Sequence, residues 1–107
     1  MKTAALLMGL LLAGSTGCAT APHIRVVVEG TGTTDHLTYT FPGEEERTLR
    51  NPALPFERMG ARKGRVAIRL EGVQGELTCK IIINGRQVRT ATSSTGAALA
   101  CDHSMAV

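Results

Sequence analysis

The sequence predicts a small all-β protein: an antiparallel, immunoglobulin-like β-sandwich of about seven strands, closed by a disulfide and preceded by a signal peptide. Three observations support this fold class. Short runs of alternating apolar and polar residues fill the segment 22–107, and this period is that of strands with one buried face. Gly, Pro and Asn separate the runs, as in antiparallel sandwiches. The chain has no Trp, one Tyr and two Phe, so we expect a core of Val, Ile and Leu.

The strands of the first half are predicted from alternation and its interruptions. The segment 24–29 alternates, the Gly/Thr-rich segment 30–35 turns the chain, and 37–41 alternates again until a Pro-Gly pair ends it. Residues 47–49 suit a short return strand. The expected inward side chains are Ile24, Val26, Val28, Leu37, Tyr39 and Phe41.

The segment 51–56 contains two prolines and is predicted to cross the fold without joining a central strand. A proline has no backbone N–H, so it cannot donate to the ladder of an interior strand. Leu54 and Phe56 are the large apolar side chains of this crossing. We expect them to close one end of the core.

The strands of the second half are predicted around one strong turn signal. Asn84-Gly85 accepts positive φ at both central positions of a type I′ turn, which indicates a hairpin of 77–83 with 86–92. The segments 65–71 and 97–101 also alternate. The expected inward side chains are Val66, Ile68, Leu70, Leu77, Cys79, Ile81, Ile83, Ala97, Leu99 and Cys101.

Residues 1–21 are predicted to be an export signal. Lys2 precedes an uncharged apolar run, 4–13, and small residues follow that run as far as Cys18. The run of about ten apolar residues is roughly half of what spans a bilayer. The tetrapeptide Ser-Thr-Gly-Cys that ends at Cys18 resembles a lipobox, with Ser where Leu is usual. We therefore expect an extracytoplasmic protein that is anchored to the cell membrane by a lipid on Cys18.

Two alternatives to this lipid anchor stay open. The run Ala19-Thr20-Ala21 is an ordinary A-x-A cleavage site, although Pro22 directly after the bond disfavours its use. Cleavage there would give a secreted protein. The third outcome is an uncleaved apolar anchor.

The cysteine count supports lipidation of Cys18. The chain has three cysteines, and an odd cysteine in an exported protein calls for an explanation. A lipid on Cys18 leaves Cys79 and Cys101 as a pair, in a compartment where disulfides persist. Both lie on inward phases of their predicted strands. Such a bond would add about 3 kcal/mol to the stability; two free, buried thiols are the alternative.

The segment 58–65 is the densest basic stretch of a chain whose formal charge is +3. An anionic membrane surface or a wall polymer is the partner that such a stretch would fit. A solvated loop is the simpler interpretation. Interleaved aromatic residues are absent, so we expect no nucleic-acid partner. The candidate interaction surface comprises Phe56, Arg58, Arg62, Lys63 and Arg65.

Residues with catalytic or metal-binding spacing are scarce. Cys101, Asp102 and His103 are consecutive, but successive strand residues point to opposite faces. Hydrolase elbows, P-loops and dinucleotide-binding glycine motifs are missing from the sequence. We expect a non-catalytic protein without a metal or a cofactor.

Four segments, taken in order, resemble the actinobacterial MmpS-type proteins, the small accessory partners of MmpL transporters. The first is a strand that ends in Gly30-Thr31-Gly32, and the second is the strand Leu-Thr-Tyr-Thr at 37–40. The third is Leu-Pro-Phe at 54–56, where the family has Leu-Pro-Trp. The fourth, Leu-Thr-Cys-Lys-Ile-Ile-Ile-Asn-Gly at 77–85, is similar to the family's Ile-Thr-Cys-x-Ile-x-Val-Asp-Gly.

The resemblance implies a disulfide-closed β-sandwich outside the membrane that assists an exporter of lipids or siderophores. Relatives that work with transporters begin with a transmembrane helix, whereas this chain begins with a predicted cleavable signal. Two functions are therefore expected as alternatives. One is a transporter accessory lipoprotein, and the other is a stand-alone cell-surface module that binds a wall polymer, a lipid or a small ligand.

Overall fold

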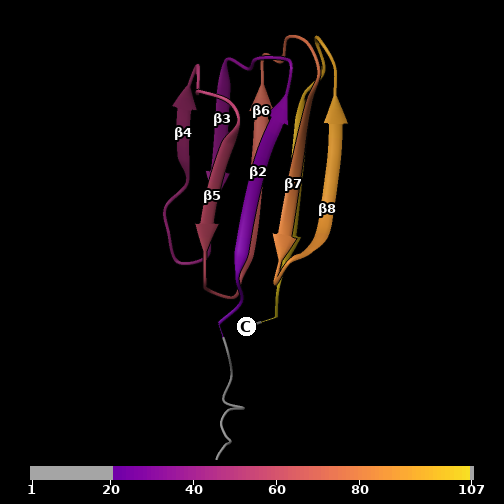
Figure 1. Ribbon diagram of the computed structural model, residues 1–107. Coiled ribbons are helices and arrows are strands. Elements are labelled where there is room, and N and C mark those ends of the chain that lie inside the picture. The colour runs from indigo at the N-terminus through magenta and orange to yellow at the C-terminus, as the bar shows by residue number, and fades with distance from the viewer. Residues whose placement is uncertain (1–20, 107) are drawn as a thin grey trace, which may run out of the picture.

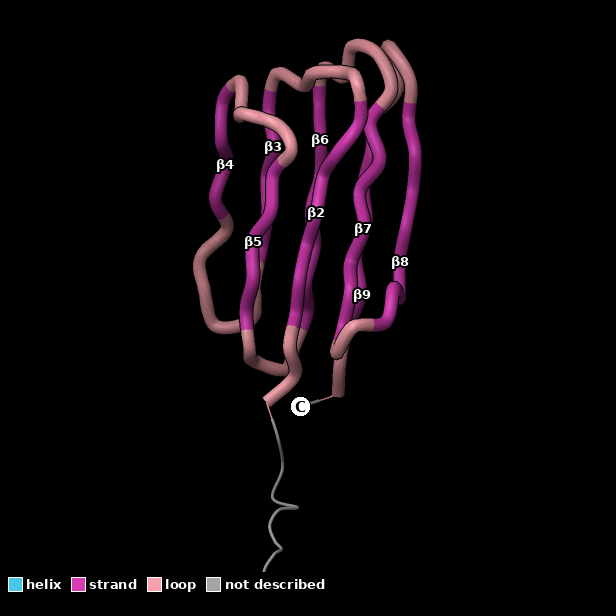
Figure 2. Tube along the Cα trace, viewed as in Figure 1, coloured by secondary structure: helices cyan, strands magenta, loops and turns pink. Residues whose placement is uncertain are grey.

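The computed structural model describes residues 21–106, and these residues form two packed, four-stranded antiparallel sheets (Figure 1, Figure 2). None of these residues is helical. Cys18 and nearly all of the predicted signal peptide lie outside the described residues. The strands are β2 (Ile24–Gly30), β3 (His36–Thr40), β4 (Arg47–Arg50), β5 (Phe56–Gly60), β6 (Arg65–Glu71), β7 (Leu77–Ile83), β8 (Arg86–Ser93) and β9 (Leu99–Ser104).

The first sheet has the strand order β5-β2-β7-β8, and the second has the order β4-β3-β6-β9. Every pairing is antiparallel. Alternate side chains of each strand point into the space between the sheets and form the core, as the alternation predicts. The side chains that the core buries completely or almost completely are Ile24, Val26, Val28, Leu37, Val66, Ile68, Leu70, Val73, Leu77, Cys79 and Ile81.

The hairpin predicted from Asn84-Gly85 is confirmed. Asn84 has a φ of 52° and Gly85 a φ of 79°, and Ile83 pairs with Arg86 across the two-residue turn. Both positions are left-handed, which Asn and Gly accept at little cost. The register shifts once, between Ile81 and Ile82, where the ladder carries an irregularity.

The predicted disulfide is confirmed, and the alternative of two free thiols is wrong. Cys79 of β7 is bonded to Cys101 of β9, and their Cα atoms are 6.3 Å apart. Both side chains are buried in the core. Because β7 and β9 belong to different sheets, the bond joins the two layers of the sandwich.

Two segments differ from the prediction by more than a residue at one end. Residues 56–60 form a strand, β5, at the edge of the first sheet, so there are eight described strands. An edge strand needs ladder bonds on one side only. In β5, Arg58 occupies an inward position that an apolar residue usually takes. The alternation of apolar and polar residues that predicts a strand is therefore missing from this segment. The last strand spans Leu99–Ser104 instead of 97–101, and Ala97 is exposed.

The strands run between two ends of the sandwich. We call the end where the chain enters β2 the proximal end; it comprises residues 22–23, 42–46, 61–64, 84–86 and 104–106. It lies at the bottom of Figure 1, next to the C-terminus. The opposite, distal end comprises the loops 31–35, 51–55, 72–76 and 94–98.

Candidate functional site

The predicted interaction surface is divided by the fold into three separate places. Phe56 and Arg58 belong to β5, at one lateral side of the sandwich. Arg62 and Lys63 lie in the loop between β5 and β6, at the proximal end. Arg65 begins β6 in the other sheet and points outward.

Arg58 closes the lateral side between β5 and β3, so most of its side chain faces inward and not toward a partner. Its guanidinium lies 5.4 Å from the ring centroid of Tyr39 and 5.2 Å from that of Phe41. It also donates hydrogen bonds to Tyr39 Oη at 3.0 Å and to Glu44 Oε1 at 2.7 Å. Cation–π contact and two hydrogen bonds explain how a charged group occupies an inward phase.

Phe56 supports the same lateral side. Its ring lies 5.5 Å from that of Tyr39, and the two planes are inclined by 42°. Phe56 and Leu54 pack, half-buried, against the core, as predicted for the crossing segment. Phe56 and Arg58, both in the first sheet, thus pack against Tyr39 of the second sheet.

Arg62 and Lys63 are exposed at the proximal end. Arg62 lies against Gly43 of the neighbouring 42–46 loop, close enough that a Cβ at Gly43 would clash with its guanidinium. The backbone N–H of Met105 donates to the carbonyl of Gly64 at 2.9 Å, which ties the 61–64 loop to the C-terminal segment.

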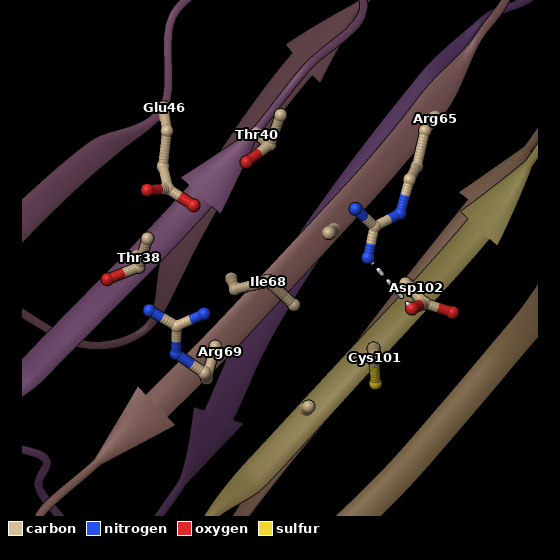
Figure 3. A pocket seen from close by; sticks show the side chains of 10 residues that line it. Thr38, Thr40, Glu46, Arg65, Ile68, Arg69, Cys101 and Asp102 are labelled. Carbon is tan, nitrogen blue, oxygen red and sulfur yellow. Dashed lines mark hydrogen bonds and ion pairs between the residues drawn. The ribbon is translucent and has the colours of Figure 1, made fainter.

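A shallow hollow of about 130 Å³ lies on the outer face of the second sheet (Figure 3). Its floor consists of Ala67 and Ala100, two small residues on neighbouring strands. Arg65 and Arg69 line the hollow from the same strand, β6, as Figure 3 shows. Its other polar lining residues are Thr38, Thr40, Glu46 and Asp102.

The charges of this hollow are balanced. Arg65 is paired with Asp102 at 3.2 Å, and Arg69 lies 3.6 Å from Glu71. All four side chains are more than half exposed, so these pairs are worth little and are open to exchange with a ligand. The hollow is lined by guanidinium, carboxylate and hydroxyl groups, and the hydroxyl of the buried Thr38 is hydrogen-bonded to that of Thr48 at 3.0 Å. Sequence analysis missed it, although Arg-x-Ala-x-Arg on the outward phase of β6 was its signal.

A second hollow, of about 340 Å³, opens at the proximal end. Ile83 and Val88 give it apolar walls, and both side chains also pack against the core. Arg86 and His103 add a cation and an imidazole, and Asn84 completes the lining.

Residues 21–106 hold no group of three or more His, Cys, Asp and Glu side chains that could bind a metal ion. Within the same range, no helix is long and apolar enough to cross a membrane. Each buried side-chain nitrogen or oxygen of the described part has a hydrogen-bond partner. The polar groups that a ligand could reach therefore lie on the surface.

Comparisons with known proteins add no assignment. No protein-family model matches this chain, and a search of the curated proteins finds no match either.

Proposed function

We propose that this chain is a non-catalytic envelope lipoprotein that serves as an accessory subunit of an MmpL-type membrane transporter. In this proposal the lipid on Cys18 replaces the transmembrane helix of the similar proteins. The disulfide-closed sandwich is then the part that contacts the transporter outside the cytoplasmic membrane.

The observation that carries the proposal is where the four family-like segments fall in the fold. Leu-Thr-Tyr-Thr is β3, which supplies Leu37 and Tyr39 to the core. The cysteine segment is β7 with its hairpin turn, and Leu54 and Phe56 pack against the core. The resemblance therefore covers residues that build this sandwich and its disulfide, and this placement supports the proposal.

A close turn at the distal end adds to this support. Gly30 and Gly32 pass so near the backbone of residues 74–76 that a Cβ at either position would clash with it. Gly30 also has a φ of 140°, which side chains with a Cβ rarely adopt. The Gly-Thr-Gly turn of the resemblance thus meets a backbone requirement.

The proposal is tested by recovering partners from native membranes. Cells that produce the full-length chain are treated with a cleavable crosslinker, and antibodies against the sandwich then isolate it. We expect a large multi-pass transporter among the crosslinked proteins and an acylated Cys18 at the mature N-terminus by mass spectrometry. The matched control is Cys18→Ala, which should lose the acyl chains and most of the recovered transporter.

Two outcomes would contradict the proposal. One is repeated recovery of the acylated protein without any transporter. The other is a Cys18→Ala protein that carries no acyl chain and yet recovers the transporter in the same amount, since the lipid would then have no role.

The second candidate function is a stand-alone binding module of the cell surface. The hollow between Arg65 and Arg69 favours it, because two guanidiniums, two carboxylates and two threonines surround a floor of small residues. A ligand of this hollow should bind more weakly to an Arg69→Ala protein. Binding of wall polymer that is unchanged in Arg69→Ala and in Arg65→Ala would rule this face out.

A further inference from the structure

The path of the chain is fixed at the proximal end from residue 22 onward. Pro22 is buried. The backbone N–H of His23 donates to Asn84 Oδ1 at 2.8 Å, and the backbone N–H of Asn84 donates to the carbonyl of His23 at 2.8 Å. This reciprocal pair fastens the start of the domain to the β7–β8 turn.

The short distance along the chain from Cys18 limits how far this end can lie from a lipid. Three residues separate Cys18 from Pro22. An extended chain spans about 3.4 Å per residue, so Pro22 lies within about 14 Å of the Cα of Cys18. The negative potential of an anionic membrane acts over about 8–10 Å at physiological salt. A lipid on Cys18, as the proposed function requires, therefore keeps the start of the domain within about two Debye lengths of the surface, where part of that potential remains.

The proximal end carries the basic side chains that such a potential attracts. Arg62, Lys63 and Arg86 are exposed, and none of them takes part in the five ion pairs found among the described residues. Each basic residue near an anionic surface strengthens binding about fivefold. These three residues therefore form one cationic set.

The unpaired acidic residues of this end are fewer than its unpaired basic residues. In the 42–46 loop, Glu44 is paired with Arg58 at 2.7 Å, and Glu46 lines the hollow on the outer face of the second sheet. Asp102 is paired with Arg65. Glu45 and Glu46, which take part in none of the five ion pairs of the described residues, are left as the carboxylates that oppose Arg62, Lys63 and Arg86.

Apolar surface accompanies these cations. Met59 is 54% exposed and is the next-to-last residue of β5, where it lies opposite Arg25 of β2 in the ladder. The proximal hollow places Ile83 and Val88 beside Arg86 and His103. Cationic groups next to exposed apolar side chains are what interfacial membrane binding requires.

We infer that the proximal end is a docking surface for the anionic phospholipid headgroups of a membrane, with a lipid phosphate received by Arg86 in the proximal hollow. The sandwich then stands on the bilayer with its strands rising from it. The distal loops and the outer-face hollow are left free for a partner. This inference rests on the lipid anchor of the proposed function and adds the orientation of the domain.

The test attaches the processed chain chemically to vesicles. Cys79 and Cys101 are bonded to each other, so Cys18 can be coupled selectively to a maleimide lipid. One vesicle set is phosphatidylcholine and the other contains about one third phosphatidylglycerol. Hydrogen exchange of the backbone amides is then followed by mass spectrometry.

On anionic vesicles we expect exchange at residues 61–64 and 84–86 to slow severalfold, with residues 31–35 and 94–98 unchanged. On neutral vesicles this slowing should be absent. Arg62→Ala/Lys63→Ala should remove most of it. The matched control, Arg50→Ala/Arg69→Ala, removes the same charge from exposed positions nearer the distal end and should keep it. Arg86→Ala should restore fast exchange mainly at residues 84–86.

Three results would overturn the inference: equal slowing on neutral vesicles, slowing at the distal loops instead, or the same slowing with millimolar inorganic phosphate and no vesicle. The last result would mark a site for free anions. If no slowing is seen on anionic vesicles, the acylation of Cys18 in cells is not affected by that result. If Cys18 is not acylated in cells, the lipid anchor is wrong, but the vesicle measurement remains valid. The two proposals therefore fail separately.

Discussion

The two lateral sides of the sandwich are closed by different chemistry. Toward β8 and β9, the Cys79–Cys101 disulfide joins the sheets, and Arg89 Nε donates to the carbonyl of Asp102 at 3.0 Å. Toward β4 and β5, a single arginine, Arg58, lies over Tyr39 and the neighbouring Phe41. One side is covalent and the other depends on a charged group at the margin of an apolar core.

The difference predicts that the two sides stabilise the fold through different states of the chain. A disulfide acts mainly on the unfolded chain, because it removes conformations that the chain would otherwise explore. Arg58 acts in the folded state, where it covers aromatic rings and satisfies Tyr39 Oη. Breaking each side in turn should therefore change the slope of the unfolding curve differently, and should lower the free energy of unfolding by different amounts.

The largest effect is expected from removing the disulfide. Cys79→Ala/Cys101→Ala opens a loop between residues 22 positions apart and should lower the free energy of unfolding by about 3 kcal/mol. The slope of the unfolding free energy with urea should rise, because the released unfolded chain exposes more surface. Urea titrations in a Cys18→Ser background check both quantities. A loss below about 1 kcal/mol would contradict this account.

The next effect is expected at Arg58. Arg58→Ala should cost about 2 kcal/mol, because the cation–π contacts and the hydrogen bond to Tyr39 are lost together. Arg58→Lys should recover about half, since an ammonium keeps the charge and lacks the planar fork. The urea slope should not change. Arg62→Ala is the matched control at an exposed position and should stay within about 0.5 kcal/mol of the parent.

The contrast between the two sides also explains what the sequence could reveal. Cysteines and the Asn84-Gly85 turn carry their geometry in their residue types, so the disulfide, the hairpin and the inward faces of β2, β6 and β7 were predictable. The residue type of Arg58 does not reveal its position, because an arginine in a basic stretch usually indicates a solvated loop. Its inward position depends on Tyr39, which lies 19 residues away in the chain.

The candidate sites were hidden for a related reason. The outer-face hollow needs β6 and β9 side by side, so that Ala67 and Ala100 form one floor. The proximal hollow needs His103 beside the β7–β8 turn. Both are products of strand order, and alternation within single strands says nothing about which strands become neighbours.

A smaller effect is expected from the phenol oxygen of Tyr39. Tyr39→Phe keeps the ring under Arg58 and removes the acceptor of its 3.0 Å hydrogen bond, so we expect a loss of about 1 kcal/mol. Combined with Arg58→Ala, the loss should be clearly smaller than the sum of the two single losses. Additive losses would mean that Arg58 stabilises the fold through its ring contacts alone.

The smallest effect is expected from Glu44→Gln, which removes the outermost link of the same side. The Glu44–Arg58 pair is 40% exposed at Glu44 and 33% exposed at Arg58, so solvent screens most of its attraction and a loss of about 0.5 kcal/mol or less is expected. Urea titrations at low salt and in about 1 M NaCl check the cause, because screening should make the parent and variant equally stable at high salt. A loss as large as that of Arg58→Ala would mean that the carboxylate positions the guanidinium over the rings. The noncovalent side would then depend on a pair of charges, and salt alone should weaken it while leaving the disulfide side intact.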